Sequence, residues 1–236
     1  MNRLIIAIDG PVGSGKSSVA QRLATLLGYT HLDTGAMYRA VALKAMRQGI
    51  ALEEPAAVEA LATVSRIDFA TSNGSLRILL DGEDVSDEIR APEMSQQASL
   101  VAVVPGVRRV LVAEQRRIGA AGGVVIDGRD IGTVVFPAAG LKIYLDARVD
   151  IRARRRWLEY RGKGKEVDFD FLLEEVRERD RRDHDRAISP LRRAPDAIYV
   201  DSTAMEAEEV AQLIALLARE RQKEIATVAS APPAHR

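Results

Sequence analysis

Residues 10–17, Gly-Pro-Val-Gly-Ser-Gly-Lys-Ser, combine three glycines with a lysine and a serine at the spacing G-x-x-x-x-G-K-S. Such glycines let backbone N–H groups turn inward around a polyphosphate, which Lys16 can reach and beside which Ser17 can bind Mg²⁺. The apolar run 4–8 precedes this phosphate loop, and a helical pattern over 19–27 follows it. The sequence therefore predicts a nucleotide phosphate site, with an ordinary glycine-rich turn that caps a helix as the alternative.

A second set of residues stands at a similar boundary, Leu-Asp-Thr-Gly-Ala-Met-Tyr-Arg at 32–39. The segment 30–32 predicts a strand that ends at Asp33, after which Thr34 and Gly35 open a helix. Free N–H groups at a helix N-terminus bind anions, and Arg39 one turn later could point its guanidinium at the same phosphate. A capped helix with a surface arginine explains this octapeptide equally well.

A third set, Asp127-Gly128-Arg129-Asp130, follows the apolar segment 124–126. An aspartate at the end of a buried strand resembles the Walker-B arrangement, in which the carboxylate lies near the Mg²⁺ held by the loop serine. Ser17 and Asp127 are therefore the candidate metal ligands, the latter directly or through water. The alternative is an Asp-Gly turn with a local ion pair between Arg129 and Asp130.

Arginines gather between residues 148 and 193, where thirteen Arg and two Lys accompany eleven acidic residues. Arg179, Asp183 and Arg186 recur at spacings of four and three, which predicts one shared helix face. Such runs are usually solvated faces with internal salt bridges, as we expect for Arg155 and Glu159. We nevertheless expect some of these arginines to contact phosphate, because phosphoryl transfer gathers negative charge that needs cations beyond one lysine and one Mg²⁺. An earlier helix in this region begins with Arg152, Arg154, Arg155 and Arg156.

Apolar strand-like runs that alternate with helical patterns must position these side chains. The runs cover 4–8, 30–32, 124–126, 141–145 and 197–200. This alternation predicts an α/β fold with a parallel sheet and helices on both faces. Such sheets bind ligands beyond the carboxyl ends of their strands, where the phosphate loop, Asp33, Asp127 and Asp201 all fall.

Residues 67–89 interrupt the alternation of strands and helices, because they contain short β-like segments at 67–69, 76–80 and Val85. The hairpin-type turns Ser72-Asn73-Gly74 and Asp81-Gly82 separate them, which predicts a small antiparallel insertion. It is acidic, so we expect it to shape a pocket rather than grip phosphate. Residues 161–165 predict a mobile tip between two helices, and 229–236 have the composition of a disordered tail. Trp157 and the apolar stripe 210–217 are expected in the core.

Composition bounds the class of protein. The 236 residues suffice for one domain with lobes or two small domains. The 34 basic and 34 acidic residues cancel, so nothing global indicates nucleic acid or a membrane surface. There is no cysteine and no apolar run of membrane-spanning length, and we expect no signal segment, so the cytoplasm is the location we expect by default. None of the three histidines, His31, His184 and His235, is expected to act in catalysis.

Together, the phosphate loop and the segments 33–39, 127–137 and 179–183 resemble the bacterial cytidylate (CMP/dCMP) kinases, in order and with similar spacing as far as about Arg221. The resemblance implies a three-layer P-loop kinase with a central parallel sheet, a small antiparallel β insertion and a short helical lid. Residues 1–33, 102–150 and 187–225 would form the core. Residues 34–101 would form the nucleoside-monophosphate domain with its insertion at about 67–90. Residues 151–186 would carry the lid, and 226–236 would be a disordered tail.

The resemblance also implies residue roles, with ATP and CMP or dCMP as substrates, Mg²⁺ as cofactor and a monomer without nucleic-acid or membrane partners. Thr34, Arg39 and Arg129 would hold the CMP phosphate, Ser99, Arg108 and Asp130 would read cytosine, Arg179 and Asp183 would hold the sugar, and Arg186 would contact phosphate between the nucleotides. The lid would be the hairpin 152–170, with Arg156 and Arg161 contacting phosphate. ATP would be bound by Gly10, Pro11, Val12, Gly13, Ser14, Gly15, Lys16, Ser17 and Ser18. The catalytic set would be Lys16, Arg129, Arg156, Arg161 and Arg186.

Elementary chemistry agrees with the implied base reading. Cytosine presents an amino donor at N4 and acceptors at N3 and O2, which match a carboxylate (Asp130) and an arginine (Arg108). A carboxylate that faces uracil O4 would be left unpaired, at a cost of roughly 1–3 kcal/mol. The chain departs from the family at Val12, usually small and polar, at Thr34, more often Ser, and at Gly106, often charged.

Other functions remain to be weighed against this one. A UMP/CMP or shikimate-type kinase would share the phosphate loop but leave Ser99, Arg108 and Asp130 without a purpose. A nucleotide-gated switch lacks its Asn-Lys-x-Asp and D-x-x-G motifs, and a nucleic-acid module lacks a stacking platform because only 4% of residues are aromatic. The segment 201–203 could approach the adenine or simply cap a helix.

Overall fold

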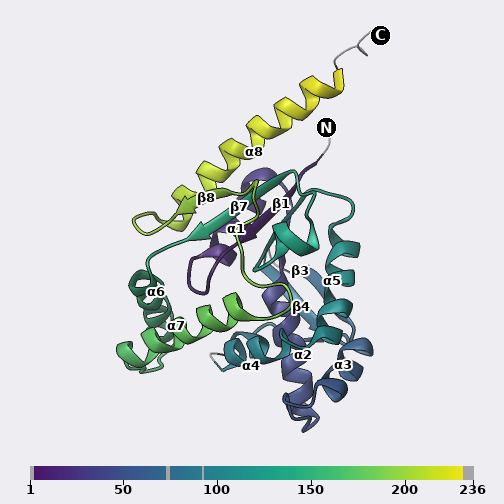
Figure 1. Ribbon diagram of the computed structural model, residues 1–236, viewed down its shortest axis with the longest axis vertical. Helices are drawn as coiled ribbons and strands as arrows, with labels where there is room; N and C mark the ends of the chain where they lie inside the picture. The colour runs from purple at the N-terminus through teal and green to yellow at the C-terminus, as the bar shows by residue number, and fades with distance from the viewer. Residues whose placement is uncertain (1–2, 73–74, 92, 231–236) are drawn as a thin grey trace.

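The computed structural model describes residues 3–72, 75–91 and 93–230. At its centre, five parallel strands form a sheet in the order β2-β6-β1-β7-β8 (Figure 1). Because β1 pairs with β6 and β7, the carboxyl ends of these strands lie side by side, with Asp9 opposite Gly128 and Tyr144. The predicted α/β architecture with a parallel sheet is confirmed. The strands are β1 (Ile5–Asp9), β2 (Thr30–Asp33), β6 (Val124–Gly128), β7 (Leu141–Asp146) and β8 (Ile198–Asp201).

Helices cover both faces of this sheet. Ile6 and Ile8 of β1 pack with α1 (Lys16–Leu27) and α8 (Ala207–Ser230) on one face. Ala7, between them, packs on the other face with α2 (Thr34–Arg47) and α5 (Pro105–Gly119). Successive side chains of a strand point to opposite faces, so a strand buried on both sides needs a continuous apolar run. This requirement explains the unbroken apolar runs seen in the sequence.

A lobe between β2 and β6 carries the small antiparallel sheet, in the order β3-β4-β5. Asp81 and Gly82 join β4 to β5 with φ values of 53° and 91°, the left-handed conformation that a tight hairpin turn needs. The predicted insertion is therefore confirmed, although the turn residues Asn73 and Gly74 lie outside the described residues. The lobe consists of α2, α3 (Pro55–Thr63), β3 (Ile67–Ser72), β4 (Ser75–Leu80), β5 (Glu83–Asp84), η1 (Glu88–Arg90), α4 (Met94–Val101) and α5.

One apolar cluster joins this lobe to the sheet. Leu32 of β2 and Ile126 of β6 belong to the same cluster as Met37 of α2, Ile78 of β4 and Val101 of α4. The described residues of the lobe therefore share one core with the sheet, which fixes the lobe's helices relative to the carboxyl ends of the strands.

Two helices, α6 (Val149–Gly162) and α7 (Phe169–Asp185), pack together beyond β7 and lie beside α4 (Figure 1). Their buried contact is small, and Val12 of the phosphate loop joins Ala153 and Val176 in it. Trp157 is half-buried in this pair and donates its indole N–H to the Val167 carbonyl oxygen at 3.0 Å, so its predicted place in the core is wrong. Arg186 is also not on the predicted helix face, because α7 ends at Asp185.

The last helix, α8, runs through Ser230 and passes the edge of the sheet (Figure 1). Its predicted apolar stripe is confirmed, since Val210, Ala211 and Ile214 pack on α1 and the sheet. The disordered tail predicted for 226–236 is wrong for 226–230, where the helix continues, and 231–236 lie outside the described residues. Among the described helices, none combines the length and apolarity needed to cross a membrane.

Candidate active site

The phosphate loop joins β1 to α1, as its motif predicts. Gly10 has a φ of +153°, and a Cβ there would lie 1.9 Å from the Leu145 carbonyl oxygen of β7. Gly13 has a φ of +75°, and a Cβ there would lie 2.8 Å from the Arg152 carbonyl oxygen of α6. Both positions combine a backbone conformation that side chains disfavour with a close backbone neighbour, so only glycine fits.

Lys16 is the buried first residue of α1. Its Nζ donates to the Pro11 carbonyl oxygen at 2.6 Å and lies 3.3 Å from the Ser14 hydroxyl. Burial and the neighbouring Arg129 lower the pKa of Lys16 well below its ordinary value, although nearby carboxylates oppose this. Its direct partners are uncharged oxygens, so the ammonium favours an anionic ligand at this point.

Asp127, at the end of β6, divides its carboxylate between two neighbours. Its Oδ2 accepts from the Ser17 hydroxyl at 2.7 Å, and its Oδ1 lies 2.6 Å from His31 Nε2. Thr34 donates its hydroxyl to the Asp127 carbonyl oxygen at 2.7 Å. Burial opposes protonation of His31, but the contact with Asp127 outweighs it and raises the histidine pKa. Adjacent parallel strands bring these residues together, with Asp33 opposite Asp127.

The side chains of Ser17 and Asp127 fit a magnesium site. Carboxylate and hydroxyl oxygens suit this hard cation, which commonly takes one or two protein oxygens and completes its shell with phosphates and waters. The described part of the chain holds no group of three or more His, Cys, Asp or Glu that could bind a metal.

Asp33 and Arg39 stand beside the N-terminus of α2. Asp33 caps the helix by accepting from the Ala36 N–H at 3.0 Å, and Arg39 Nη2 donates to its other oxygen at 2.8 Å. Burial raises the pKa of Asp33, but Arg39 and His31 outweigh burial and hold the pKa below its ordinary value. The first turn of α2 and the guanidinium of Arg39 are thus held together on one side of the cavity.

A buried ion pair marks the far end of the cavity. Arg108 of α5 donates through Nη2 to Oδ2 of Asp130, and Arg186 Nη2 lies 3.6 Å from Oδ1. The Asp130 and Arg108 side chains are only 7% and 5% exposed. Ser99 of α4 is buried and also lines the cavity. A carboxylate, a guanidinium and a hydroxyl in this arrangement can read the polar edge of a flat ligand.

Arg129 and α7 connect the two ends. Arg129 Nε donates to Asp183 Oδ2 at 2.7 Å, and Arg179 Nε lies 4.0 Å from the same oxygen. Burial raises the pKa of Asp183, but Arg129 and Arg179 outweigh it and lower the pKa. Burial, followed by repulsion from Arg129, lowers the pKa of Arg179 to about 9. Arg179 also donates through Nη1 to the Ser95 hydroxyl of α4.

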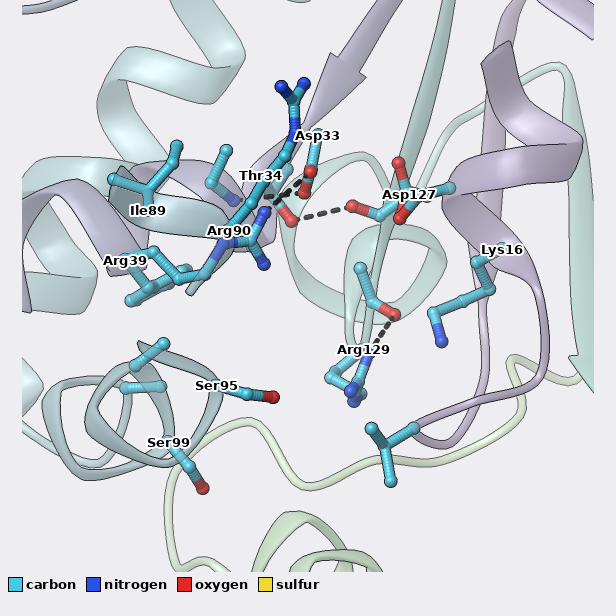
Figure 2. Close-up of a pocket in the computed structure, with 18 of the residues that line it drawn as sticks. Lys16, Asp33, Thr34, Arg39, Ile89, Arg90, Ser95, Ser99, Asp127 and Arg129 are labelled. Atoms are coloured by element: carbon cyan, nitrogen blue, oxygen red, sulfur yellow. Dashed lines mark hydrogen bonds and ion pairs between the residues drawn. The ribbon is translucent and has the colours of Figure 1, made fainter. Parts of the chain in front are cut away.

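These groups surround one cavity of about 660 Å³, part of which is drawn in Figure 2. Nine lysine or arginine side chains line it against six acidic ones, an excess of three positive charges. Several of its guanidinium nitrogens are buried without a hydrogen-bond partner among the described residues, namely Arg39 Nε, Arg156 Nε, Arg179 Nε and Arg186 Nη2. Buried donors are seldom left unpaired, so this surplus calls for a ligand rich in oxygen acceptors.

Most residues singled out from the sequence meet at this cavity. Pro11 and Ser14 lie in the same loop and hold Lys16, and Gly10 is in contact with β7 at its start. The residues that line the cavity are Val12, Gly13, Gly15, Lys16, Ser17, Ser18, Thr34, Arg39, Ser99, Arg108, Asp127, Arg129, Asp130, Arg156, Arg179, Asp183 and Arg186.

Two arginine expectations differ from the structure. Arg161 does not line the cavity, and its guanidinium lies 4.7 Å from the centre of the Trp157 ring. Arg155 does not pair with Glu159, which instead contacts Lys163 at 2.7 Å. Arg155 donates to the Ser202 carbonyl oxygen at 2.6 Å and lies 3.4 Å from that of Ser14. The first turns of α6 lie on the phosphate loop, where backbone carbonyls are the nearer acceptors.

Sequence reasoning missed three polar residues of this region: Asp9, His31 as a partner of Asp127, and Ser95. Asp9 is buried beside the site, where its two oxygens accept the N–H groups of Ile131 and Gly132 at 2.7 Å each, at the start of η2 (Ile131–Val135). Burial raises its pKa to about 6, despite these hydrogen bonds. Asp9 follows an apolar strand in the sequence as Asp127 does, and this shared pattern could have predicted that Asp9 lies near the site.

A family model described as cytidylate kinase matches residues 6–220 of the chain. The chain belongs to the cytidylate kinase family. A cytidylate kinase from Solibacter usitatus is 50% identical over 221 residues, covering 93% of this chain and 94% of its own. A cytidylate kinase from Pelotomaculum thermopropionicum is 50% identical over 210 residues, covering 89% and 93%. A solved shikimate kinase from Acinetobacter baumannii is 19% identical, and the match covers 92% of this chain and 94% of that chain with a TM-score of 0.47.

The departures of this cytidylate kinase family member from the family pattern have local causes. Val12 packs its side chain against Ala153 and Val176 of the α6–α7 pair. Thr34 keeps the hydroxyl that a serine would supply and donates it to the carbonyl oxygen of Asp127. A Cβ at Gly106 would lie 1.7 Å from the Glu59 side chain, which pairs with an arginine of α5 outside the cavity. Of the three, only Val12 places an apolar side chain where the family usually has a polar one at the cavity wall.

Proposed function

We propose that this protein transfers the γ-phosphoryl group of ATP to CMP or dCMP, which yields ADP and CDP or dCDP. The observation that carries the proposal is a single cavity with the phosphate loop at one end and the buried Asp130–Arg108 pair at the other. A phosphate donor and a polar-edged base can occupy these two ends at once. Membership of the cytidylate kinase family supports the same activity.

The donor end would bind ATP through the backbone N–H groups of residues 10–18 and through Lys16. The N-terminus of α1 adds its partial positive charge to the same phosphates. Ser17 and Asp127 would hold Mg²⁺ with the ATP phosphates. The cation would screen the negative charge of the polyphosphate.

The acceptor end would hold the CMP phosphate with Thr34, Arg39 and Arg129. The first turn of α2 supplies free N–H groups, and Arg39 Nε is a buried donor without a described partner. Asp130 would accept from cytosine N4, Arg108 would donate to N3 and O2, and Ser99 would add a hydroxyl to the base edge.

In the reaction, an oxygen of the CMP phosphate attacks the γ-phosphorus while the bond to the β,γ-bridging oxygen breaks and ADP leaves. A phosphate oxygen is already ionised at neutral pH, so the protein need not remove a proton. Lys16, Arg129, Arg156 and Arg186 would stabilise the charge on the transferring group. Arg161 would not contact it in the arrangement seen here, because it lies on Trp157 outside the cavity.

We further propose residues 34–101 as the acceptor-nucleotide lobe and 151–186 as a lid that excludes water during transfer. The small apolar contact between α6 and α7 suits a part that moves. The enzyme would act as a monomer in the cytoplasm, where ATP and nucleoside monophosphates occur. Light scattering on the purified chain tests the monomer.

A steady-state panel of acceptors tests the function. Purified protein with ATP and Mg²⁺ is assayed for ADP release with CMP, dCMP, UMP, AMP and shikimate. We expect CMP and dCMP to have the highest kcat/KM. A higher value for UMP, AMP or shikimate would refute the assignment, and ADP release independent of any acceptor would indicate a nucleotide hydrolase instead.

A further inference from the structure

The segment that carries Arg129 and Asp130 leads directly into the short helix η2, and Asp130 stands at the N-terminal boundary of that helix. The Asp130 carbonyl oxygen accepts from the Val134 and Val135 N–H groups at 2.8 Å and 3.1 Å. The first N–H groups of a helix have no partner within it, and an aspartate at the boundary usually accepts one of them with its own side chain. Asp130 is therefore the residue from which such a capping contact is expected.

The Asp130 side chain does not make this contact. Its carboxylate forms no capping hydrogen bond to η2, all of whose residues are described, and contacts Arg108 and Arg186 instead. Two other helices show the usual arrangement, in which the boundary aspartate accepts from the third N–H group of its own helix. Asp33 does so for α2 at 3.0 Å, and Asp168 does so for α7 at 2.8 Å. Asp130 thus offers to the arginines a carboxylate whose position favours a bond to its own helix.

Asp9 supplies the missing acceptors from the end of β1. Its two oxygens accept from the Ile131 and Gly132 N–H groups at 2.7 Å each, and the residue is only 4% exposed. The approach is close, since a Cβ at Gly132 would lie 3.3 Å from Asp9 Oδ2 and 3.1 Å from Lys142 Cδ. Asp9 therefore caps η2 in place of Asp130.

The two carboxylates divide the available donors between them. Burial raises the pKa of Asp9 and the nearby Asp130 adds to the rise, whereas the two N–H groups and Lys16 lower it. A buried carboxylate needs hydrogen-bond donors, and two carboxylates that shared one set of donors would repel each other. Asp9 takes the backbone donors and Asp130 takes the guanidinium donors, so the two side chains do not compete.

We propose that Asp9 is a positioning residue for base recognition, because by capping η2 it keeps the Asp130 carboxylate turned toward Arg108 and the base. The inference rests on the proposed function. Without the Asp9 carboxylate, the buried Ile131 and Gly132 N–H groups would lack acceptors, and the adjacent Asp130 side chain would turn back to accept from its own helix. The enzyme would then discriminate less well between cytosine and uracil, although no residue that touches the base had been replaced.

The test measures kcat/KM for CMP and UMP in the wild type, Asp9→Asn and Asp9→Ala. Asparagine keeps the volume and one acceptor oxygen, whereas alanine removes both acceptors, so each variant leaves at least one N–H group of η2 without a partner. We expect the CMP-over-UMP ratio to fall at least about fivefold in both variants, the value of one helix-capping hydrogen bond. The fall should come from a higher KM for CMP rather than from kcat, while the kcat/KM for UMP stays constant or rises.

Arg116→Ala is the matched control, because Arg116 supports the opposite end of η2. It donates to the Val135 and Val134 carbonyl oxygens at 3.0 Å and 2.8 Å and is not among the residues that line the cavity. This variant loosens η2 but keeps both bonds to Asp9, so the ratio should stay within about twofold of the wild type.

A double variant tests whether Asp9 acts through Asp130. In Asp9→Asn combined with Asp130→Asn, the ratio should fall no further than in Asp130→Asn alone, because the base-reading carboxylate is already absent there. An additional fall in the double variant would show that Asp9 affects discrimination by another route and would overturn the inference.

Thermal unfolding checks that each variant is folded, and Asp9→Asn decides the test if Asp9→Ala does not fold. A folded Asp9 variant that loses activity with CMP and UMP in parallel, or whose ratio stays within about twofold of the wild type, would overturn the inference and leave the proposed function intact. An equal fall in the ratio for Arg116→Ala would do the same. Wild-type protein with no preference for CMP over UMP would overturn the proposed function, and this inference with it.

Discussion

The substitution Asp130→Asn separates base recognition from the rest of the reaction. Alanine at this position would leave the buried Arg108 and Arg186 without a carboxylate and cost about 3–5 kcal/mol of stability. Asparagine keeps the volume and one acceptor oxygen. Because Arg108 donates to Oδ2 of Asp130, the amide oxygen should remain at that point and the amino group should take the place of Oδ1.

That orientation of the asparagine amide determines whether the CMP-over-UMP ratio rises or falls. An amino group in place of Oδ1 faces the N4 donor of cytosine with another donor, whereas it matches the O4 acceptor of uracil. The lost hydrogen bond to a charged acceptor is worth about 1.5–3 kcal/mol, which corresponds to roughly 10- to 150-fold in kcat/KM. The CMP-over-UMP ratio should fall by at least about this factor, because UMP also gains a partner.

Steady-state ADP release with CMP and UMP measures the ratio, and thermal unfolding reports whether the variant is folded. Asp87→Asn is the matched control, because Asp87 lines the cavity but its side chain is 91% exposed and lies 3.9 Å from its arginine neighbours. The control should leave the ratio unchanged. A folded Asp130→Asn protein whose ratio stays within about twofold of the wild type would refute Asp130 as the base-reading residue.

Four further substitutions test other parts of the site. Lys16→Ala should lower kcat about 10²- to 10³-fold while CMP affinity stays nearly constant, and near-normal turnover would remove Lys16 from the mechanism. Arg156→Ala should lower kcat at least tenfold, whereas Arg161→Ala should stay within about twofold; equal losses would show that both reach the phosphate. The raised pKa of Asp9, about 6 against 3.8, makes the folded state bind the extra proton, so its contribution to stability falls as pH rises through this range. The free energy of unfolding of Asp9→Asn, measured by denaturant titration, should therefore rise by up to about 3 kcal/mol relative to that of the wild type between pH 4 and 6.5. A difference in unfolding free energy that does not change with pH would contradict a raised pKa of Asp9.

Much of the donor end was predictable because its chemistry is local. The glycines, Lys16 and Ser17 are consecutive, and their strand–loop–helix context can be seen in a window of about 25 residues. Asp127 was predictable as a partner of Ser17 because parallel strands place their carboxyl ends at one edge of the sheet. The 2.7 Å contact between these two side chains confirms their proximity.

The arginines were the least predictable part. Thirteen of them stand between residues 148 and 193, and their number alone does not distinguish a ligand contact from a surface salt bridge. Arg155 turned toward backbone carbonyls of the phosphate loop and the β8–α8 connection, and Arg161 stacked on Trp157. A long flexible side chain takes the nearest acceptor, which depends on how two helices pack.

By itself, the sequence determined the sheet, the phosphate loop, the family and the pattern of polar residues at the ends of strands. Those features follow from residue types within short windows and from the period of apolar positions. Only the tertiary structure decided that Asp9 accepts hydrogen bonds from η2, that His31 and Ser17 both contact the Asp127 carboxylate, and that Arg179 donates to Ser95. In each case the two partners are 84 or more residues apart, and the contact forms only once strands or helices are packed in register.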